Sequence, residues 1–115
     1  MNINEKIVSL LFDVNLPVYF IHKPNDNYSE KIDDFITFNY RRNNNWYSND
    51  VSEVEQFSVT LNYITKSIEK VVDTKELILE QLKNNDRVFS VVDYQTVYDN
   101  ATSEFLSVIT FTILM

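Results

Sequence analysis

Apolar residues near the start of the chain recur at the spacing of one helical face. They predict a helix over about residues 3–13, and they are Ile3, Ile7, Leu10, Leu11 and Val14. Asn2 is suited to cap this helix, with Glu5 three residues later. Asn15 is a suitable stop, and Pro17 cannot continue a helix.

A short apolar run after Pro17 and two stretches of alternating side chains predict three strands in the next part of the chain. They cover about residues 18–22, 35–41 and 55–64. The third is the clearest, because its four large apolar residues alternate with Gln, Ser, Thr and Asn, as in a strand with one buried face. These apolar residues are Phe57, Val59, Leu61 and Tyr63.

The last third of the chain predicts one more helix and two long strands. The helix covers about residues 74–84, and periodic Ile68, Val71 and Val72 leave open whether it begins near Lys66. The strands cover about residues 88–98 and 104–114, and the second is apolar on both faces. Such a strand is typically central in its sheet or covered by another chain.

These elements predict a single domain over residues 1–115 in the order α-β-β-β-α-β-β. The fold class is α+β, a mostly antiparallel sheet with two helices packed on one face. The chain has no glycine, so its turns require other residues at positive φ. Asn84, Asn85 and Asn100 are the expected positions, because Asn tolerates the left-handed region best.

Composition excludes several kinds of chemistry. Without glycine there is no phosphate-binding P-loop, no Rossmann turn and no G-x-S-x-G elbow. Without cysteine there is no disulfide or thiolate zinc site, and the single His22 allows no His-His metal motif. We therefore expect no catalytic residue, no cofactor and no metal.

Charge and hydropathy bear on the partners. The net charge of -7 argues against general nucleic-acid binding, which needs a basic surface. No apolar stretch approaches the ~20 residues that span a bilayer, and no secretory signal is visible, so no membrane partner is expected.

Few side chains are candidates for catalysis or metal binding. His22 near Asp26 is a weak general-base candidate, since no nucleophile accompanies it. The pairs Asp33/Asp34 and Glu53/Glu55, and the oxygens of Asp26, Asn27 and Glu30, lack the arrangement of a metal site and are typical of solvated charges.

The long polar segment over residues 42–54 offers the best candidate for a partner interface. Arg41, Arg42, Trp46 and Tyr47 lie on or beside it, and Arg, Trp and Tyr are enriched in interface hot spots. The alternative is structural, with Trp46 closing one end of the core.

The order of elements resembles the small tail terminator, or tail completion, proteins of long-tailed bacteriophages. The segments that carry the resemblance are Leu16-Pro-Val-Tyr-Phe-Ile, Phe35-Ile-Thr-Phe-Asn-Tyr, Gln56-Phe-Ser-Val-Thr-Leu-Asn-Tyr, the helix around Glu76 to Leu82, and the hairpin ending in Phe111-Thr-Ile-Leu. The resemblance is a pattern of elements over nearly the whole chain.

This resemblance implies a structural virion protein that is not an enzyme and has no cofactor. It implies a homo-oligomer, a hexameric ring at the head–tail junction, assembled in the host cytoplasm. The partners it implies are the tail tube protein and the head connector or stopper protein. DNA passes through the ring without specific binding, in keeping with the acidic net charge. Another neck component such as a head-closure protein, an acidic DNA-mimic inhibitor of a host enzyme, and a small enzyme centred on His22 are the alternatives.

Overall fold

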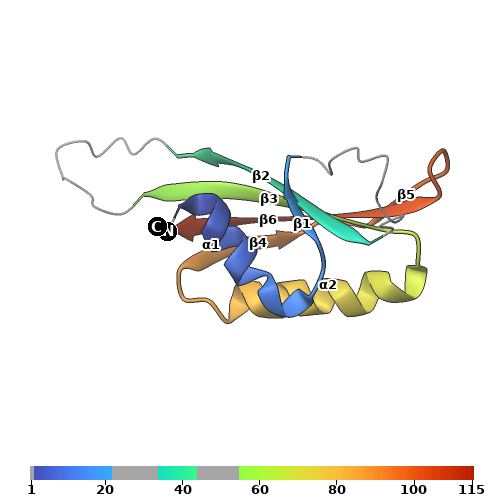
Figure 1. Ribbon diagram of the computed structural model, residues 1–115, viewed down its shortest axis with the longest axis horizontal. Helices are drawn as coiled ribbons and strands as arrows, with labels where there is room; N and C mark the ends of the chain where they lie inside the picture. Colours follow the sequence, from blue (N-terminus) through green and yellow to red (C-terminus); the bar gives the residue numbers. More distant parts are fainter. Residues whose placement is uncertain (1, 22–33, 44–54) are drawn as a thin grey trace.

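The computed structural model of the chain describes residues 2–21, 34–43 and 55–115. Its elements follow the chain in this order: α1 (Ile3–Leu10), a 3-10 turn η1 (Phe12–Val14), β1 (Val18–Phe20), β2 (Phe35–Arg42), β3 (Gln56–Thr65), α2 (Ile68–Lys83), β4 (Val88–Asp93), β5 (Val97–Asp99) and β6 (Glu104–Leu114). The predicted α+β class is confirmed, with both helices below the sheet and its other face uncovered by them (Figure 1).

The six strands form one mixed sheet in the order β1-β2-β3-β6-β4, with β5 also paired to β6. All pairings are antiparallel except that of β1 with β2, which is parallel. β6 is central, as its apolar side chains on both faces predict. β1 and β4 are the two edge strands at opposite sides of the sheet.

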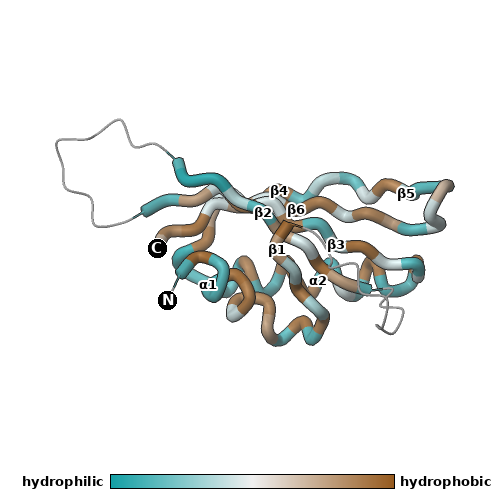
Figure 2. The backbone as a smooth tube through the Cα atoms, turned by 45° about the horizontal axis from the view of Figure 1, so that its top comes forward, coloured by the Kyte–Doolittle hydropathy of each residue, from teal (hydrophilic) through white to brown (hydrophobic). Residues whose placement is uncertain are grey.

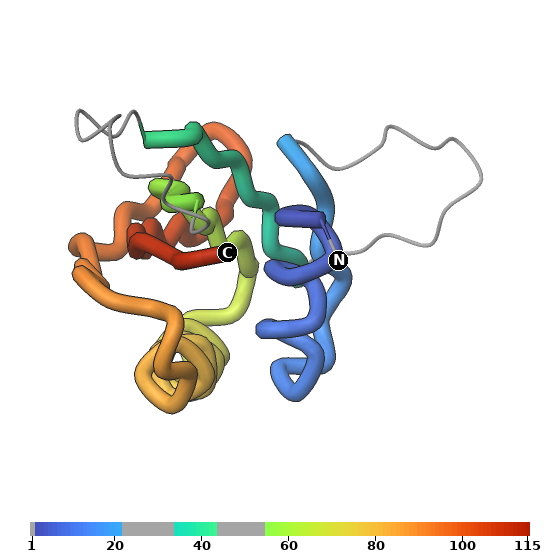
Figure 3. Tube along the Cα trace, turned by 90° about the vertical axis from the view of Figure 1, so that its left-hand side faces the viewer, coloured from blue at the N-terminus to red at the C-terminus, as the bar shows by residue number. Residues whose placement is uncertain are grey.

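The core lies between the sheet and the two helices. Figure 3 shows α1 on the side of β1 and α2 on the other side. The alternating side chains of β2, β3 and β6 point down into this layer, where Ile7, Ile78 and Leu82 of the helices meet them with 0% exposure. The sheet residues of the core are Ile36, Phe38, Phe57, Val59, Leu61, Tyr63, Ile109, Phe111 and Ile113.

The N-terminal helix is held as the sequence predicts. The Asn2 side chain accepts a hydrogen bond from Glu5 N at 2.9 Å, and Asn15 ends η1 at φ 60°. The hydroxyl of Tyr40 on β2 donates to Asn4 Oδ1 at 2.5 Å, which ties the first turn of α1 to the sheet.

Helix α2 (Ile68–Lys83) is longer than the helix predicted over about residues 74–84. It runs as one helix from Ile68, which settles the open question of its start in favour of the earlier residues. Ser67 is the N-cap residue of α2. Its backbone N–H donates a hydrogen bond to the Thr65 hydroxyl at 3.1 Å, which fixes the turn that leads into the helix.

The predicted strand over residues 88–98 is wrong, because the chain leaves the sheet after Asp93 and rejoins it at Val97. Lys75 of α2 holds this break: its Nζ pairs with Asp93 Oδ1 at 2.6 Å and donates to Tyr94 O at 3.2 Å. Thr96 lies within 3.4 Å of the same ammonium and shares a hydrogen bond with Ser107 at 2.9 Å. A contact from a distant helix therefore decides where the strand ends.

The expected positive φ at Asn84, Asn85 and Asn100 is also wrong. Among the described residues the positive-φ positions are Asn15, Ile21, Ser90 and Ser103. At the end of α2, Asn85 Oδ1 instead accepts from Arg87 N at 2.9 Å. In the last hairpin, Asp99 Oδ1 accepts from Ala101 N at 2.9 Å, and the left-handed residue comes at Ser103. Side-chain-to-backbone turns thus replace the expected left-handed asparagines.

Ser90 occupies a bulge in β4. Phe89 pairs with Thr112 and Val92 with Thr110, so Ser90 and Val91 together oppose Phe111. Ser90 has φ 55°, the conformation that glycine usually supplies at such a bulge. The extra residue places Phe89 and Val92 on the same face of the sheet, which simple alternation along the strand does not predict.

Replacing Ser90 with Gly is expected to raise the free energy of unfolding by about 0.5–1 kcal/mol. The left-handed conformation costs a residue with a Cβ about 1–2 kcal/mol, and part of the gain is lost to the greater freedom of glycine in the unfolded chain. Urea denaturation measures the change. The matched control is Ser9→Gly on the exposed side of α1, where the same substitution is expected to destabilise by about 0.5 kcal/mol. A loss of stability in both variants contradicts the strain at Ser90.

Candidate interaction surfaces

The predicted interface residues are only partly within the described chain. Arg41 and Arg42 end β2, where both are exposed, and Trp46 and Tyr47 lie outside the described residues. Consecutive strand residues point to opposite faces, so the two guanidinium groups do not form one patch. Arg42 pairs with Glu55 at 2.8 Å, with both side chains well exposed, and this contact contributes little to stability.

Arg41 lines a shallow hollow of about 360 Å³ on the sheet face that the helices leave open. The floor of this hollow is made of short polar side chains from four strands. They include Asn39, Ser58, Thr60, Ser90, Thr110 and Thr112. The described residues that line this hollow offer hydroxyl and amide groups and the Arg41 guanidinium, so the hollow can make hydrogen bonds.

The carboxylates singled out in the sequence are engaged with neighbouring cations or lie outside the described residues. Asp34 accepts hydrogen bonds from the Thr65 hydroxyl and from Lys70 Nζ, the latter at 2.6 Å. His22, Asp26, Asn27, Glu30, Asp33 and Glu53 lie outside the described residues. Within residues 2–21, 34–43 and 55–115, no group of three His, Cys, Asp or Glu side chains is placed to hold a metal ion.

The environment of Asp34 shifts its pKa. Partial burial alone raises the pKa of this carboxyl, but the hydrogen bonds from Lys70 and Thr65 and the charge of Lys70 outweigh it and hold the pKa below its usual 3.8. The contact joins the start of β2 to the first turn of α2.

Asp34 is expected to make stability fall at acid pH. Its stabilising contribution is complete above the unfolded pKa of 3.8 and is lost as the pH falls through the lower folded-state pKa, since the unfolded chain binds the proton first. The difference in unfolding free energy between wild type and Asp34→Asn should therefore shrink over this range. Lys70→Met should reduce the same slope by removing the cation. Parallel curves for wild type and Asp34→Asn, measured by urea denaturation from pH 2 to 7, contradict the assignment.

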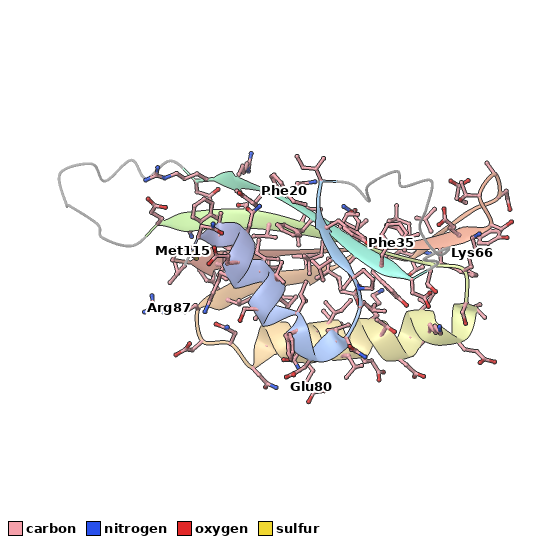
Figure 4. The ribbon with its side chains drawn as sticks, in the orientation of Figure 1. Phe20, Phe35, Lys66, Glu80, Arg87 and Met115 are labelled. Atoms are coloured by element: carbon pink, nitrogen blue, oxygen red, sulfur yellow. The ribbon has the colours of Figure 1, made fainter. Side chains whose placement is uncertain are left out.

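An apolar groove lies between α1 and the edge strand β1. Its volume is about 480 Å³, and its apolar wall is formed by Val8, Phe12 and Phe20. The Phe12 side chain is 78% exposed, and Val8 and Phe20 are each more than 40% exposed. Figure 4 shows Phe20 on β1 beside α1. We call this surface the α1–β1 groove. Its remaining lining residues are Asn4, Glu5, Ser9, Val18 and Phe38.

A second exposed apolar surface lies at the opposite side of the sheet. Phe89, Val92 and Val97 pair with Thr112, Thr110 and Leu106, which alternate along one face of β6. The three apolar side chains therefore share the open face of the sheet, at 40%, 44% and 60% exposure. We call them the outer strip. Figure 2 shows hydrophobic colouring continuing along β5 and β6 beyond the sheet centre.

Neither apolar surface is evident from the sequence pattern. In the sequence, Phe12 and Phe20 lie within a predicted helix and a predicted strand, where apolar residues are common. Their exposure depends on which neighbouring elements cover them. One sequence feature did indicate an apolar surface on the open side of the sheet. It is the second apolar face of β6, where Leu106 and Val108 point away from the core. Single exposed hydrophobic residues are normal, but clusters on one surface mark contact sites.

Within the described residues, no helix is both long and apolar enough to cross a lipid bilayer. The sequence matches no protein-family model, and no curated protein matches it. The fold is similar to that of a solved chain from the virion of a native gene transfer agent particle, with a TM-score of 0.57. The similarity covers 91% of this chain and 82% of that chain at 10% sequence identity. At this identity the likeness establishes a shared fold.

Proposed function

We propose that this chain is a structural protein of a phage-like virion, specifically a ring-forming tail terminator or tail completion subunit. In this role it caps the tail tube, joins it to the head connector or stopper protein, and lets DNA pass without binding it. The observation that supports this function most is the fold shared, over 91% of the chain, with a component of a gene transfer agent virion. The order of elements in the sequence, which resembles that of tail terminator proteins, is the ground for the more specific role.

The chemistry of the described surface supports a structural role over an enzymatic one. The hollow on the open face is lined mainly by hydroxyl and amide groups and the α1–β1 groove mainly by apolar groups, and Asp34 is used in a contact between β2 and α2. The apolar surfaces at both edges of the sheet are the kind that subunits of an assembly bury. A head-closure protein of the same neck is the nearest alternative within this class.

The test is to locate the protein in purified particles and to remove it. Labelling should place it at the head–tail junction, and disruption of its gene should give detached heads and tails of irregular length. Added to polymerising tail tube protein, the purified chain should arrest tube growth. Its absence from purified particles contradicts a virion role, and a position between stopper and portal assigns it to head closure instead.

One observation favours a second candidate, an acidic inhibitor that mimics DNA. Four carboxylates at positions 69, 73, 76 and 80 gather on one exposed side of α2, although the acidic residues are scattered in the sequence; they are Glu69, Asp73, Glu76 and Glu80. Figure 4 shows Glu80 on the side of α2 away from the sheet. Salt-sensitive inhibition of a DNA-processing enzyme, lost on replacing these four residues by their amides, supports this candidate.

A further inference from the structure

The α1–β1 groove and the outer strip lie at opposite edges of one sheet and on its opposite faces. Phe20 of the groove shares the helix-covered face with Phe38, since the two pair in register and their rings lie 5.4 Å apart. The outer strip lies on the open face beside β4, the other edge strand. A neighbouring subunit therefore meets two different surfaces on the two sides of this chain.

We propose that the outer strip of one copy of this chain packs into the α1–β1 groove of the next copy, in a head-to-tail contact. The proposal rests on the ring-forming role above and names the surfaces that build the ring. Such a contact is heterologous, because each copy uses one surface toward each neighbour, and repetition closes a ring. Since the surfaces lie on opposite faces of the sheet, the open face of one subunit partly covers the helix-covered face of the next.

Shape and size favour a second copy as the occupant. The groove is a hollow, whereas the outer strip is a row of exposed side chains on β4 and β5 that extends about 20 Å between its outermost partners on β6. Each surface brings together three large apolar side chains that are at least 40% exposed, a clustering that marks contact sites more than singly scattered residues do.

Charge also favours this pairing. The Glu5 carboxylate lines the groove, and Asp13 is exposed directly after Phe12. At the other edge, exposed Arg87 precedes Phe89 by two residues, and its carbonyl accepts from Leu114 N at 2.9 Å, so it continues the face of the outer strip. Figure 4 shows Arg87 at the turn that leads into β4. Arg87 is thus placed to pair with the carboxylates beside the groove, which orients the approach of two copies.

The test uses one substitution in each surface and mass photometry or light scattering over a concentration series. Phe12→Lys blocks the groove and Val97→Glu blocks the outer strip, each at a side chain at least 60% exposed. Each variant alone should lose the wild-type oligomer, with the apparent Kd for self-association raised at least tenfold. Should Val97→Glu fail to fold, Val92→Glu replaces it, and thermal melting verifies the fold of each protein.

Mixing the two variants distinguishes this contact from a symmetric one. The intact strip of Phe12→Lys should bind the intact groove of Val97→Glu, giving a one-to-one dimer that cannot grow. The matched controls are Ile68→Lys and Val72→Glu on α2, whose side chains are 65% and 58% exposed, and both should assemble as wild type.

Several outcomes overturn the inference. They are a wild-type chain that stays monomeric at hundreds of micromolar, variants that assemble as wild type, a mixture without dimers, and controls that disrupt assembly equally. Loss of tail-tube binding in Phe12→Lys with self-assembly intact assigns the groove to the tube instead. The virion role is judged separately, by the presence of the protein in particles, so either idea can fail while the other stands.

Discussion

Replacing Ile78 with Ala is expected to lower the free energy of unfolding by about 3 kcal/mol. Ile78 is fully buried in the middle of α2, in the layer that joins this helix to the sheet. Removing three carbons there forfeits their transfer free energy and leaves a cavity that the surrounding strands cannot fill. Because the free energy of unfolding of a small domain is only about 5–15 kcal/mol, this single change removes a large share of the stability. Urea denaturation monitored by circular dichroism measures it.

The adjacent residue provides the control. Leu77 is on the same helix but is 42% exposed, so Leu77→Ala is expected to cost less than about 1 kcal/mol. The helix propensity of the new residue is the same in both variants, which leaves burial as the difference between them. Equal losses at the two positions contradict the packing of α2 described above.

Replacing Lys75 with Met is expected to cost about 1–3 kcal/mol. The Lys75 side chain is 17% exposed, and its ammonium joins Asp93 to the backbone carbonyl of Tyr94 where β4 ends. Met keeps the length of the side chain but leaves these acceptors without their donor, which is the costly part of the change. The same substitution should also increase hydrogen exchange at the break between β4 and β5.

Lys83→Met is the control for a lysine on the exposed end of the same helix, and its expected change is within about 0.5 kcal/mol. A double-mutant cycle with Asp93→Asn separates the ion pair from the hydrogen bonds to Tyr94 and Thr96. A Lys75→Met variant as stable as wild type shows that the break in the strand is held by something else.

The elements predicted best are those whose pattern is local and strong. β3 and β6 are predicted within one residue at each end, because β3 alternates over its whole length and β6 is a long apolar stretch that follows a polar turn. The cap at Asn2 was also correct, since it depends on residues within one turn, whereas the α-helix ends at Leu10 and Asn15 ends the 3-10 turn that follows it.

The predictions that failed depended on distant contacts. The strand over residues 88–98 is divided at the point where Lys75, on a separate element, binds the backbone between its halves. The bulge at Ser90 has no sequence signal in a chain where glycine is absent. The parallel pairing of β1 with β2 is likewise a matter of chain path that alternation does not encode.

The candidate interface was predicted from residue types, and that approach has a clear limit. Arg41 and Arg42 are exposed as expected, but alternation along β2 sends them to different faces. Trp46 and Tyr47 lie outside the described residues, so their role stays a prediction. The α1–β1 groove was missed because exposure of Phe12 and Phe20 follows from which elements fail to cover them.

The sequence by itself determined the α+β class, the two amphipathic helices, the half-buried strands and the absence of glycine- and cysteine-dependent chemistry. Those properties follow from periodicity and composition, which act within a few residues. Only the tertiary structure decided which strands became edges, where the chain takes positive φ, and which apolar side chains remain uncovered. These depend on contacts between elements far apart in the chain, and the two surfaces proposed to join neighbouring copies arise from them.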